Sequence, residues 1–307
     1  MSSKKVGDRI GHMADRTCAK CGRPIAPADE LFTAVLAGNV VCPHCRGARM
    51  PVPGARLGRC LAEHRNVSVF EAVREPGTPC RISIARSIEP ILRSSLEQEA
   101  RVAATRPHPA FLRLLGYGVS GEWLWWAEEP TGPPLASLLG QPLDAAWSAR
   151  AMADFALGAA LLEPVRGAHL EPSMVYLDAS QALRASFFDA TRHVSTHRSQ
   201  WARVGDATTG SLAYMAPELI EDAASARPAT TVYALGAILH HMLSGERPFS
   251  ARSNMDFFMK IVGEPPPRIE RSSVPGALRD AVVRCLAKKP EERFASPKEL
   301  AAALREI

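Results

Sequence analysis

The hydrophobic pattern of the chain changes near residue 130, and this change constrains the fold more than any other feature. From residue 57 to about residue 129 the apolar residues fall in short, strand-like runs. Beyond that point they fall in long segments rich in Ala and Leu, which is typical of helices packed against a core. We therefore expect an α+β protein in which a small β-rich lobe precedes a larger helical lobe.

The β-rich part contains three segments that predict strands and one that predicts a helix. Apolar runs at residues 67–70 and 82–84 flank a Pro/Gly-containing turn at residues 75–79. Residues 123–127 predict a buried strand. Residues 94–105 place Leu and Ala side chains on one face and predict the helix.

Three long helices are expected downstream, at residues 145–163, 231–244 and 275–287. Gly245 follows the second of them and is suited to end it, because glycine adopts the left-handed conformation at little cost. Gly236 lies inside the same helix, where the missing side chain would allow close helix packing. The last helix has Ser296 as its expected N-cap, and the capping box is completed by a glutamate three residues later.

Composition and charge exclude several classes of protein. With 46% hydrophobic and 22% charged residues among 307, the chain can build a sizeable core. A net charge of +5 is too small to indicate nucleic-acid binding without a clustered basic face. No apolar run approaches the roughly 20 residues that cross a bilayer. The polar first 16 residues do not resemble a signal peptide, so we expect no membrane partner and a cytoplasmic location.

Four of the seven cysteines form two C-x-x-C pairs, Cys18 with Cys21 and Cys42 with Cys45. Thiolates are soft ligands that suit zinc, and four of them complete a tetrahedral structural site. Residues 17–50 are too few to build an adequate core, so bound metal would supply their folding energy. We predict a zinc ribbon with structural Zn²⁺, a redox pair being the alternative.

The three other cysteines, Cys60, Cys80 and Cys285, lie far apart in the sequence. Free cysteine is commonly buried, and we expect three buried thiols.

Four blocks in the second half of the chain resemble protein kinases. Residues 210–218, GSLAYMAPE, are similar to the end of a kinase activation segment. Residues 232–236 and 242–249 resemble the central helix and following loop of bacterial serine/threonine kinases, and residues 285–294 resemble the family's penultimate helix with its arginine. Weaker similarity extends upstream to residue 57.

The resemblance implies a two-lobed kinase-like fold joined to the ribbon. It assigns residues 57–130 to an N-lobe and residues 131–307 to a helical C-lobe, after a flexible lead at residues 1–16 and the ribbon at 17–50. It also implies that Glu218 pairs with Arg293 and ties the activation segment to the helical lobe. A bidentate pair of this kind is strong, and breaking it from one side is costly.

The same register places unsuitable residues where phosphoryl transfer needs cations and oxygen ligands. If Ile82 and Ile84 face the core, Ala85 takes the position of the phosphate-binding lysine, and Arg86 faces the other side. The glycine-rich loop corresponds to residues 57–67, which contain one glycine. Residues 128–130 correspond to the hinge, with Ala127 as gatekeeper.

The catalytic loop shows the same departure from the family pattern. His169 replaces the base aspartate and Met174 replaces the metal-binding asparagine, although magnesium prefers oxygen ligands. The metal-binding aspartate corresponds to Phe187 in the ungapped register, while a two-residue insertion would rescue Asp189 in that role. The ungapped register matches the family's spacing and is preferred.

We therefore predict a pseudokinase that serves as a signalling scaffold or allosteric binding partner, without ordinary ATP and Mg²⁺ chemistry. One alternative is a weak or atypical ATP-dependent serine/threonine kinase, whose activity would depend on Asp189 or Arg86. The other is a zinc-ribbon adaptor for nucleic acid or transcription. It is less favoured because Phe32 is the single aromatic residue in the ribbon. Protein partners are expected, and the sequence does not specify an oligomeric state.

Overall fold

The computed structural model describes most of the chain from residue 52 onward. Several predictions lie outside the described residues: the helix at 94–105, the four ribbon cysteines Cys18, Cys21, Cys42 and Cys45, and His169, Phe187 and Asp189. The described residues are 52, 54–64, 67–86, 108–120, 123–161, 170–186, 212–222 and 225–307.

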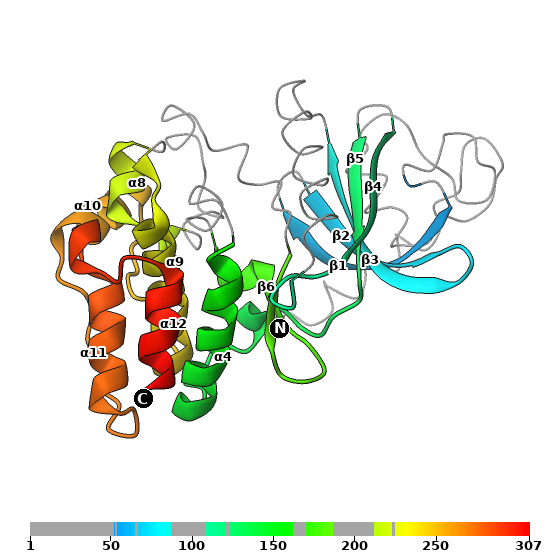
Figure 1. Cartoon of the computed structure of the whole chain (residues 1–307). Helices are drawn as coiled ribbons and strands as arrows, with labels where there is room; N and C mark the ends of the chain where they lie inside the picture. Colours follow the sequence, from blue (N-terminus) through cyan, green and yellow to red (C-terminus); the bar gives the residue numbers. More distant parts are fainter. Residues whose placement is uncertain are drawn as a thin grey trace, which may run out of the picture. The chain divides into compact units, whose positions relative to one another are not determined.

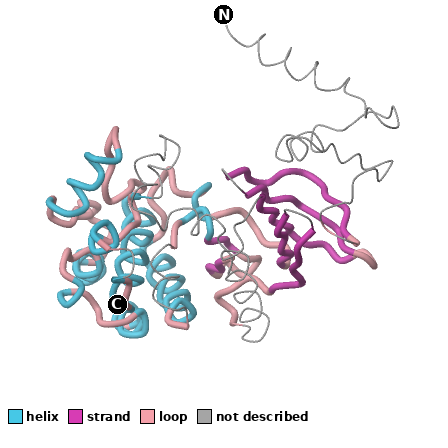
Figure 2. Tube along the Cα trace, turned by 90° about the horizontal axis from the view of Figure 1, so that it is seen from above, coloured by secondary structure: helices cyan, strands magenta, loops and turns pink. Residues whose placement is uncertain are grey.

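The described residues fall into two compact units. The first comprises those up to residue 86 together with residues 113–130, and the second comprises residues 108–112 and those from residue 131 onward. Strands dominate the first unit and helices the second, as the colours of Figure 2 show. The expected α+β class, with an antiparallel sheet before a helical lobe, is confirmed.

The first unit is a five-stranded antiparallel sheet with the strand order β1-β2-β3-β5-β4. Figure 1 shows these strands in blue to green. Neighbours in the sequence pair as hairpins, and β3 bridges the two hairpins by pairing with β5. The strands are β1 (Ala55–His64), β2 (Val67–Arg74), β3 (Thr78–Arg86), β4 (Leu114–Ser120) and β5 (Trp123–Glu128).

One face of this sheet forms the hydrophobic core of the first unit. Ile82 and Ile84 on β3 are fully buried, as the alternation of apolar residues predicts, and Trp125 on β5 packs into the same cluster. The predicted turn is present at residues 75–77 between β2 and β3. Of residues 57–67, expected to correspond to a glycine-rich loop, residues 57–64 form most of β1 and Val67 begins β2.

The second unit is built from helices around α9 (Pro228–Ser244), which is buried along almost its entire length. A helix that is apolar on all sides belongs inside a helical core. In the described part of the chain, no helix combines the length and apolarity needed to cross a bilayer. The other helices of this unit are α4 (Ala145–Ala159), α8 (Pro217–Glu221), α10 (Asn254–Gly263), α11 (Gly276–Cys285) and α12 (Pro297–Arg305).

The helix ends follow the expected capping residues. Gly245 ends α9 with a φ of 78°, and the Ser296 hydroxyl accepts a hydrogen bond from the Glu299 N–H at the start of α12. The helix α9 begins at Pro228, earlier than predicted, because the Arg227 N–H donates to the Thr230 hydroxyl and Pro228 fits the first turn.

Close packing of α9 on α11 requires Gly236. A Cβ atom at this position would overlap the Cβ of Cys285, so a larger residue would force the two helices apart. Cys80 and Cys285 are both buried, as expected, and burial raises the pKa of the Cys285 thiol to about 12. The side chain of Cys60 lies outside the described residues.

A short hairpin near the start of the second unit carries the segment that resembles a catalytic loop. The 3₁₀ turn η2 (Pro172–Met174) leads into β6 (Val175–Leu177), which pairs with β7 (Leu183–Ala185). The carboxylate of Asp178 closes the hairpin by accepting hydrogen bonds from the backbone N–H groups of Ser180 and Ala182.

Candidate functional site

The main chain of Met174 forms two hydrogen bonds, one to Glu171 and one to Ser186. Its N–H donates to the Glu171 carbonyl at 3.0 Å, and its carbonyl accepts a hydrogen bond from the Ser186 N–H at 3.0 Å. The structure therefore places Met174 next to Ser186, the residue that precedes Phe187 in the sequence. Phe187, Asp189 and His169 themselves are not among the described residues.

The side chain of Met174 is buried, with 8% of the residue exposed. A thioether is a weak hydrogen-bond acceptor and a soft ligand, whereas Mg²⁺ takes oxygen ligands in near-octahedral geometry. Met174 therefore contributes apolar packing at this position and provides no oxygen ligand for Mg²⁺.

Ala85 lies near the end of β3, where it is in register with Leu124 of β5. Arg81 and Ser83 occupy the alternate positions before it in the strand, and both are buried. Arg86 ends the strand opposite Trp123. Because every second residue of a strand lies on the same face, Arg81 is the charged residue of β3 whose position shares a face with position 85.

Arg81 forms an ion pair with Glu128 that sequence reasoning missed. The two residues are directly opposite in the β3–β5 register, the Arg81 Nε lies 3.5 Å from a Glu128 carboxylate oxygen, and the side chains are 6% and 1% exposed. The signal was an arginine inside an apolar strand, with a glutamate directly after the next predicted strand. The charge of the buried arginine is therefore compensated by the charge of the buried carboxylate.

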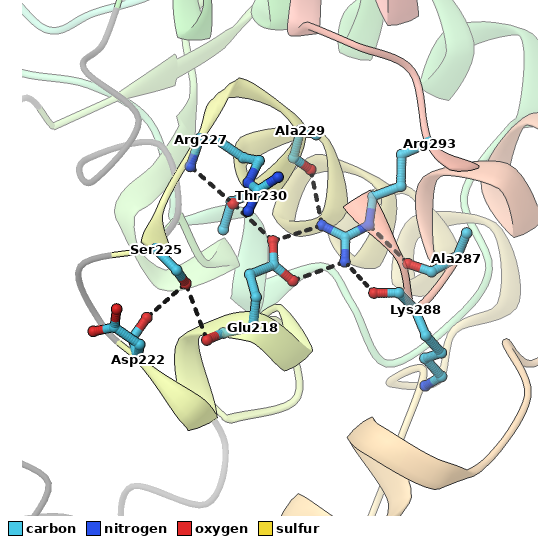
Figure 3. Close-up of polar contacts among 9 residues, drawn as sticks. All are labelled: Glu218, Asp222, Ser225, Arg227, Ala229, Thr230, Ala287, Lys288 and Arg293. Carbon is cyan, nitrogen blue, oxygen red and sulfur yellow. Dashed lines mark hydrogen bonds and ion pairs between the residues drawn. The ribbon is translucent and has the colours of Figure 1, made fainter. Parts of the chain in front are cut away.

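Glu218 and Arg293 are brought together in the helical unit, as Figure 3 shows. Two parallel hydrogen bonds of 2.8 Å each join the arginine Nη1 and Nη2 atoms to the two carboxylate oxygens. This fork-to-fork geometry is the strongest form of the arginine–carboxylate pair. Although burial alone would raise it, the hydrogen bonds and charge of Arg293 hold the pKa of Glu218 below its ordinary value.

The guanidinium of Arg293 also satisfies three backbone carbonyls. It donates to Ala287 at 2.7 Å, Lys288 at 2.9 Å and Ala229 at 3.0 Å, as drawn in Figure 3. On the other side, the Thr230 hydroxyl donates to the Glu218 carboxylate at 2.7 Å. The pair thereby joins α8, the start of α9 and the loop after α11.

Tyr214 provides a second tether for the end of the segment that resembles an activation segment. Its hydroxyl lies 2.7 Å from Nδ1 of His241 on α9, and both residues are buried. Burial raises the pKa of Tyr214 to about 12, so the phenol stays protonated. This contact was missed, because nothing local in the sequence relates two residues 27 positions apart.

The two adjacent histidines of α9 are both held neutral. Burial lowers the pKa of His241 to about 4, and the nearby Arg247 cation acts in the same direction. Burial likewise lowers the pKa of His240 to about 4. Neutral His241 thus belongs to the packing of α9 against the Tyr214 segment, whereas Nδ1 of His240 lies 3.2 Å from the Glu246 carbonyl just after α9.

Replacing Arg293 by methionine should lower the free energy of unfolding by about 3–5 kcal/mol, because it leaves the Glu218 carboxylate buried and unpaired. The matched control is Arg305→Met, which breaks an exposed ion pair with Asp154 of similar length, 2.7 Å, and should cost about 1 kcal/mol or less. Urea denaturation measures both. Equal losses in the two variants would show that the buried pair has no special weight.

The stability of the helical unit should fall as the pH drops from about 6.5 towards 4. Unfolded histidine protonates near its ordinary pKa of 6.5, whereas His240 and His241 resist protonation until about pH 4 in the folded state. The unfolded chain then binds more protons over this range, and stability decreases. Thermal melts at several pH values should show a shallower decline in His241→Gln than in the wild type; identical slopes would refute this origin.

Comparison with known proteins supports the kinase resemblance. The model of the protein kinase domain family matches residues 170–303. Over 81% of its length, the chain is 29% identical to serine/threonine-protein kinase PknH of Mycobacterium tuberculosis strain H37Rv. It is 26% identical, again over 81% of its length, to serine/threonine-protein kinase PknB of the same strain.

The chain spans about two fifths of the length of these curated relatives, 41% of PknH and 40% of PknB. A shorter match, 34% identical over 101 residues, relates 32% of the chain to 9% of serine/threonine-protein kinase PknK of Mycobacterium bovis. Residues 170–303 are therefore similar to the protein kinase domain, and most of the chain is similar to the bacterial serine/threonine kinases PknH and PknB.

Proposed function

We propose that this chain is a catalytically impaired kinase-like protein, a pseudokinase, that works as a signalling scaffold or regulatory binding partner. The observation that carries the proposal is the buried thioether of Met174 at the position where the kinase resemblance requires an oxygen ligand. Phosphoryl transfer relies on metal ions to neutralise charge on the transferred group. A methionine at this position provides no oxygen ligand for Mg²⁺, whereas the asparagine of the family would provide one.

The β3 strand supports the same proposal. The register gives the position of the phosphate-binding lysine to Ala85, and the alternating positions before it offer Ser83 and Arg81. The Arg81 cation is paired with Glu128 in a buried environment. Moving it to a phosphate would break this buried ion pair, which is costly.

The proposed losses at His169 and Phe187 rest on the sequence register, because both residues lie outside the described part of the chain. Each would remove a group from the same transition state, where one interaction worth about 3 kcal/mol changes the rate roughly a hundredfold. Asp189 is the residue that an alternative register would restore. The positions assigned to Ala85 and Met174 are the same in both registers.

The retained contacts indicate a folded helical unit and so favour a role in binding. The Glu218–Arg293 pair and the Tyr214–His241 bond hold the end of the activation-like segment against the helical unit. A lobe with a fixed shape can present a surface to a protein partner without performing phosphoryl transfer. We infer that partner binding, with no ATP turnover, is the property that this architecture supports.

We further propose that Cys18, Cys21, Cys42 and Cys45 hold a structural zinc ion, as their spacing indicates. A ribbon of this kind adds a second recognition module beside the kinase-like lobes. With four thiolates the coordination shell is complete, so the metal would have no open position for catalysis.

A thermal shift assay with ATP, run with and without Mg²⁺ beside an active bacterial kinase, tests the pseudokinase proposal. The active kinase should gain stability from ATP and Mg²⁺ together, because ligands that bind only the native state raise the melting temperature. We expect no magnesium-dependent shift for this chain. A magnesium-dependent shift that disappears in Asp189→Ala would contradict the proposal and support the atypical kinase.

Metal analysis of the purified chain tests the ribbon. We expect close to one zinc per chain in the wild type and loss of this zinc in the double variant Cys18→Ser/Cys42→Ser. The control is Cys80→Ser, in the sheet of the first unit, which should keep the metal. Salt-dependent binding to nucleic acid that chelation abolishes would instead favour the adaptor alternative.

A further inference from the structure

The C-terminal end of α10 lacks backbone donors of its own. The helix ends at Gly263, and the residues that follow its C-cap Glu264 are prolines at positions 265, 266 and 267. In a continuing helix the Ile261 carbonyl would accept a hydrogen bond from the N–H of residue 265, but proline has no N–H. Because Ile261 is fully buried, its carbonyl needs a donor from elsewhere in the fold.

The side chain of Lys288 supplies this donor. Its Nζ donates to the Ile261 carbonyl at 2.5 Å, although the two residues are 27 positions apart. Lys288 lies between α11 and the 3₁₀ turn η6 (Pro290–Glu292). The dipole of a helix favours a cation at its C-terminus. A lysine from a distant segment therefore caps α10.

The ammonium group of Lys288 has neutral partners. It lies 4.4 Å from the centre of the ring of the buried Phe249, in a cation–π contact. Among the residues that the structure describes, none forms an ion pair with it. The adjacent Lys289, by contrast, is exposed and lies 3.7 Å from the carboxylate of Glu292. Two neighbouring lysines thus have different surroundings.

The amine of Lys288 is partly accessible and easily deprotonated. The residue is half-buried, and Figure 3 shows its side chain leading away from the Arg293 pair. Burial lowers the pKa of Lys288 to about 8; the charge of Arg293 acts in the same direction, and that of Glu264 opposes it. At pH 7 roughly a tenth of such amines is unprotonated. The neutral amine can still donate to the Ile261 carbonyl while its lone pair becomes available for nucleophilic attack.

We propose that Lys288 is a site of covalent acylation by an activated acyl donor, a thioester or an acyl phosphate. In this reaction a bond forms between Nζ and the acyl carbon, and the bond from that carbon to sulfur or to the phosphate oxygen breaks. The thiolate or phosphate leaves with the electron pair of the broken bond, and the nitrogen releases a proton to solvent. The product is a neutral amide.

Acylation would weaken the attachment of α10. The amide keeps one N–H for the Ile261 carbonyl but lacks the positive charge that the helix C-terminus and the Phe249 ring attract. The main-chain carbonyl of Lys288, which accepts a hydrogen bond from Arg293, is not altered by the reaction. We therefore expect a looser last turn of α10 and an intact Arg293 pair. A reactive Lys288 is equally compatible with a pseudokinase and with an active kinase.

The full-length variants Lys289→Arg and Lys288→Arg form a matched pair that tests the site. Each keeps one lysine at this place and preserves the local charge. When the variants are treated separately with acetyl-coenzyme A and with acetyl phosphate, mass spectrometry should find Lys288 acetylated about tenfold faster than Lys289 with at least one donor. The reaction that shows this difference identifies the donor class. Equal rates at the two lysines with both donors would overturn the proposal.

The pH dependence of the rate separates an activated amine from one that is merely exposed. Acetylation of Lys288 should accelerate as the pH rises and then level off above the pKa of about 8, where the amine is mostly neutral. A rate at Lys288 that still climbs steeply towards about pH 10 would contradict the proposal, because an ordinary lysine behaves in that way.

Hydrogen exchange measures the consequence for α10. In its last turn the Glu264 N–H donates to the Lys260 carbonyl at 3.0 Å. Exchange in this turn should be about fivefold faster in Lys288→Gln and in the acetylated chain than in the wild type, and unchanged in Lys288→Arg. Exchange in α12 should be the same in all four samples. Unchanged exchange in α10 of the acetylated chain, or faster exchange in every helix, would refute a local effect of acylation.

Discussion

The buried ion pair between Glu218 and Arg293 is the interaction on which the described helical unit depends. Desolvating two charges is expensive, and such a pair is tolerated only when nearly all its hydrogen-bonding capacity is used. Arg293 meets this condition through the carboxylate and three backbone carbonyls, and its guanidinium lies 4.9 Å from the centre of the Tyr233 ring. Because these partners come from segments far apart in the sequence, the pair fixes their relative positions.

The contacts that preserve the fold are separate from the groups that perform phosphoryl transfer. Glu218, Arg293 and Tyr214 act on packing and hydrogen bonding inside the helical unit, whereas Met174 and Ala85 stand at positions that the resemblance assigns to chemistry. A buried polar residue costs stability unless it is hydrogen-bonded, so methionine at a buried position is compatible with the fold. The proposed loss of catalysis is therefore compatible with a retained fold.

The sequence predicted those features that depend on local chemistry. Alternation placed Ile82 and Ile84 in the core, Gly245 marked the end of α9, and Ser296 marked the start of α12. These signals work because strand pleat, left-handed backbone and capping are properties of a few neighbouring residues. The start of α9 was missed by three residues, because helix boundaries depend on the competition between several caps.

The features that sequence reasoning missed are contacts between distant segments. Alternation predicted that Ile82 and Ile84 face the core but did not show that the other face of β3, which carries Arg81, is buried too, so the pairing of Arg81 with Glu128 was missed. The Tyr214–His241 bond likewise requires the segment before α8 to be placed against α9. Such contacts follow from topology, which periodicity does not encode.

Arg293 and Arg81, the arginines that are buried among the described residues, differ in their surroundings. Arg293 is surrounded by carbonyls and belongs to the scaffold, whereas Arg81 sits in the strand that would supply the phosphate-binding cation. Replacing a buried pair as a whole with apolar residues is often neutral, but removing one partner is not. The Arg81–Glu128 pair therefore holds a positive charge in β3 next to a carboxylate of opposite sign.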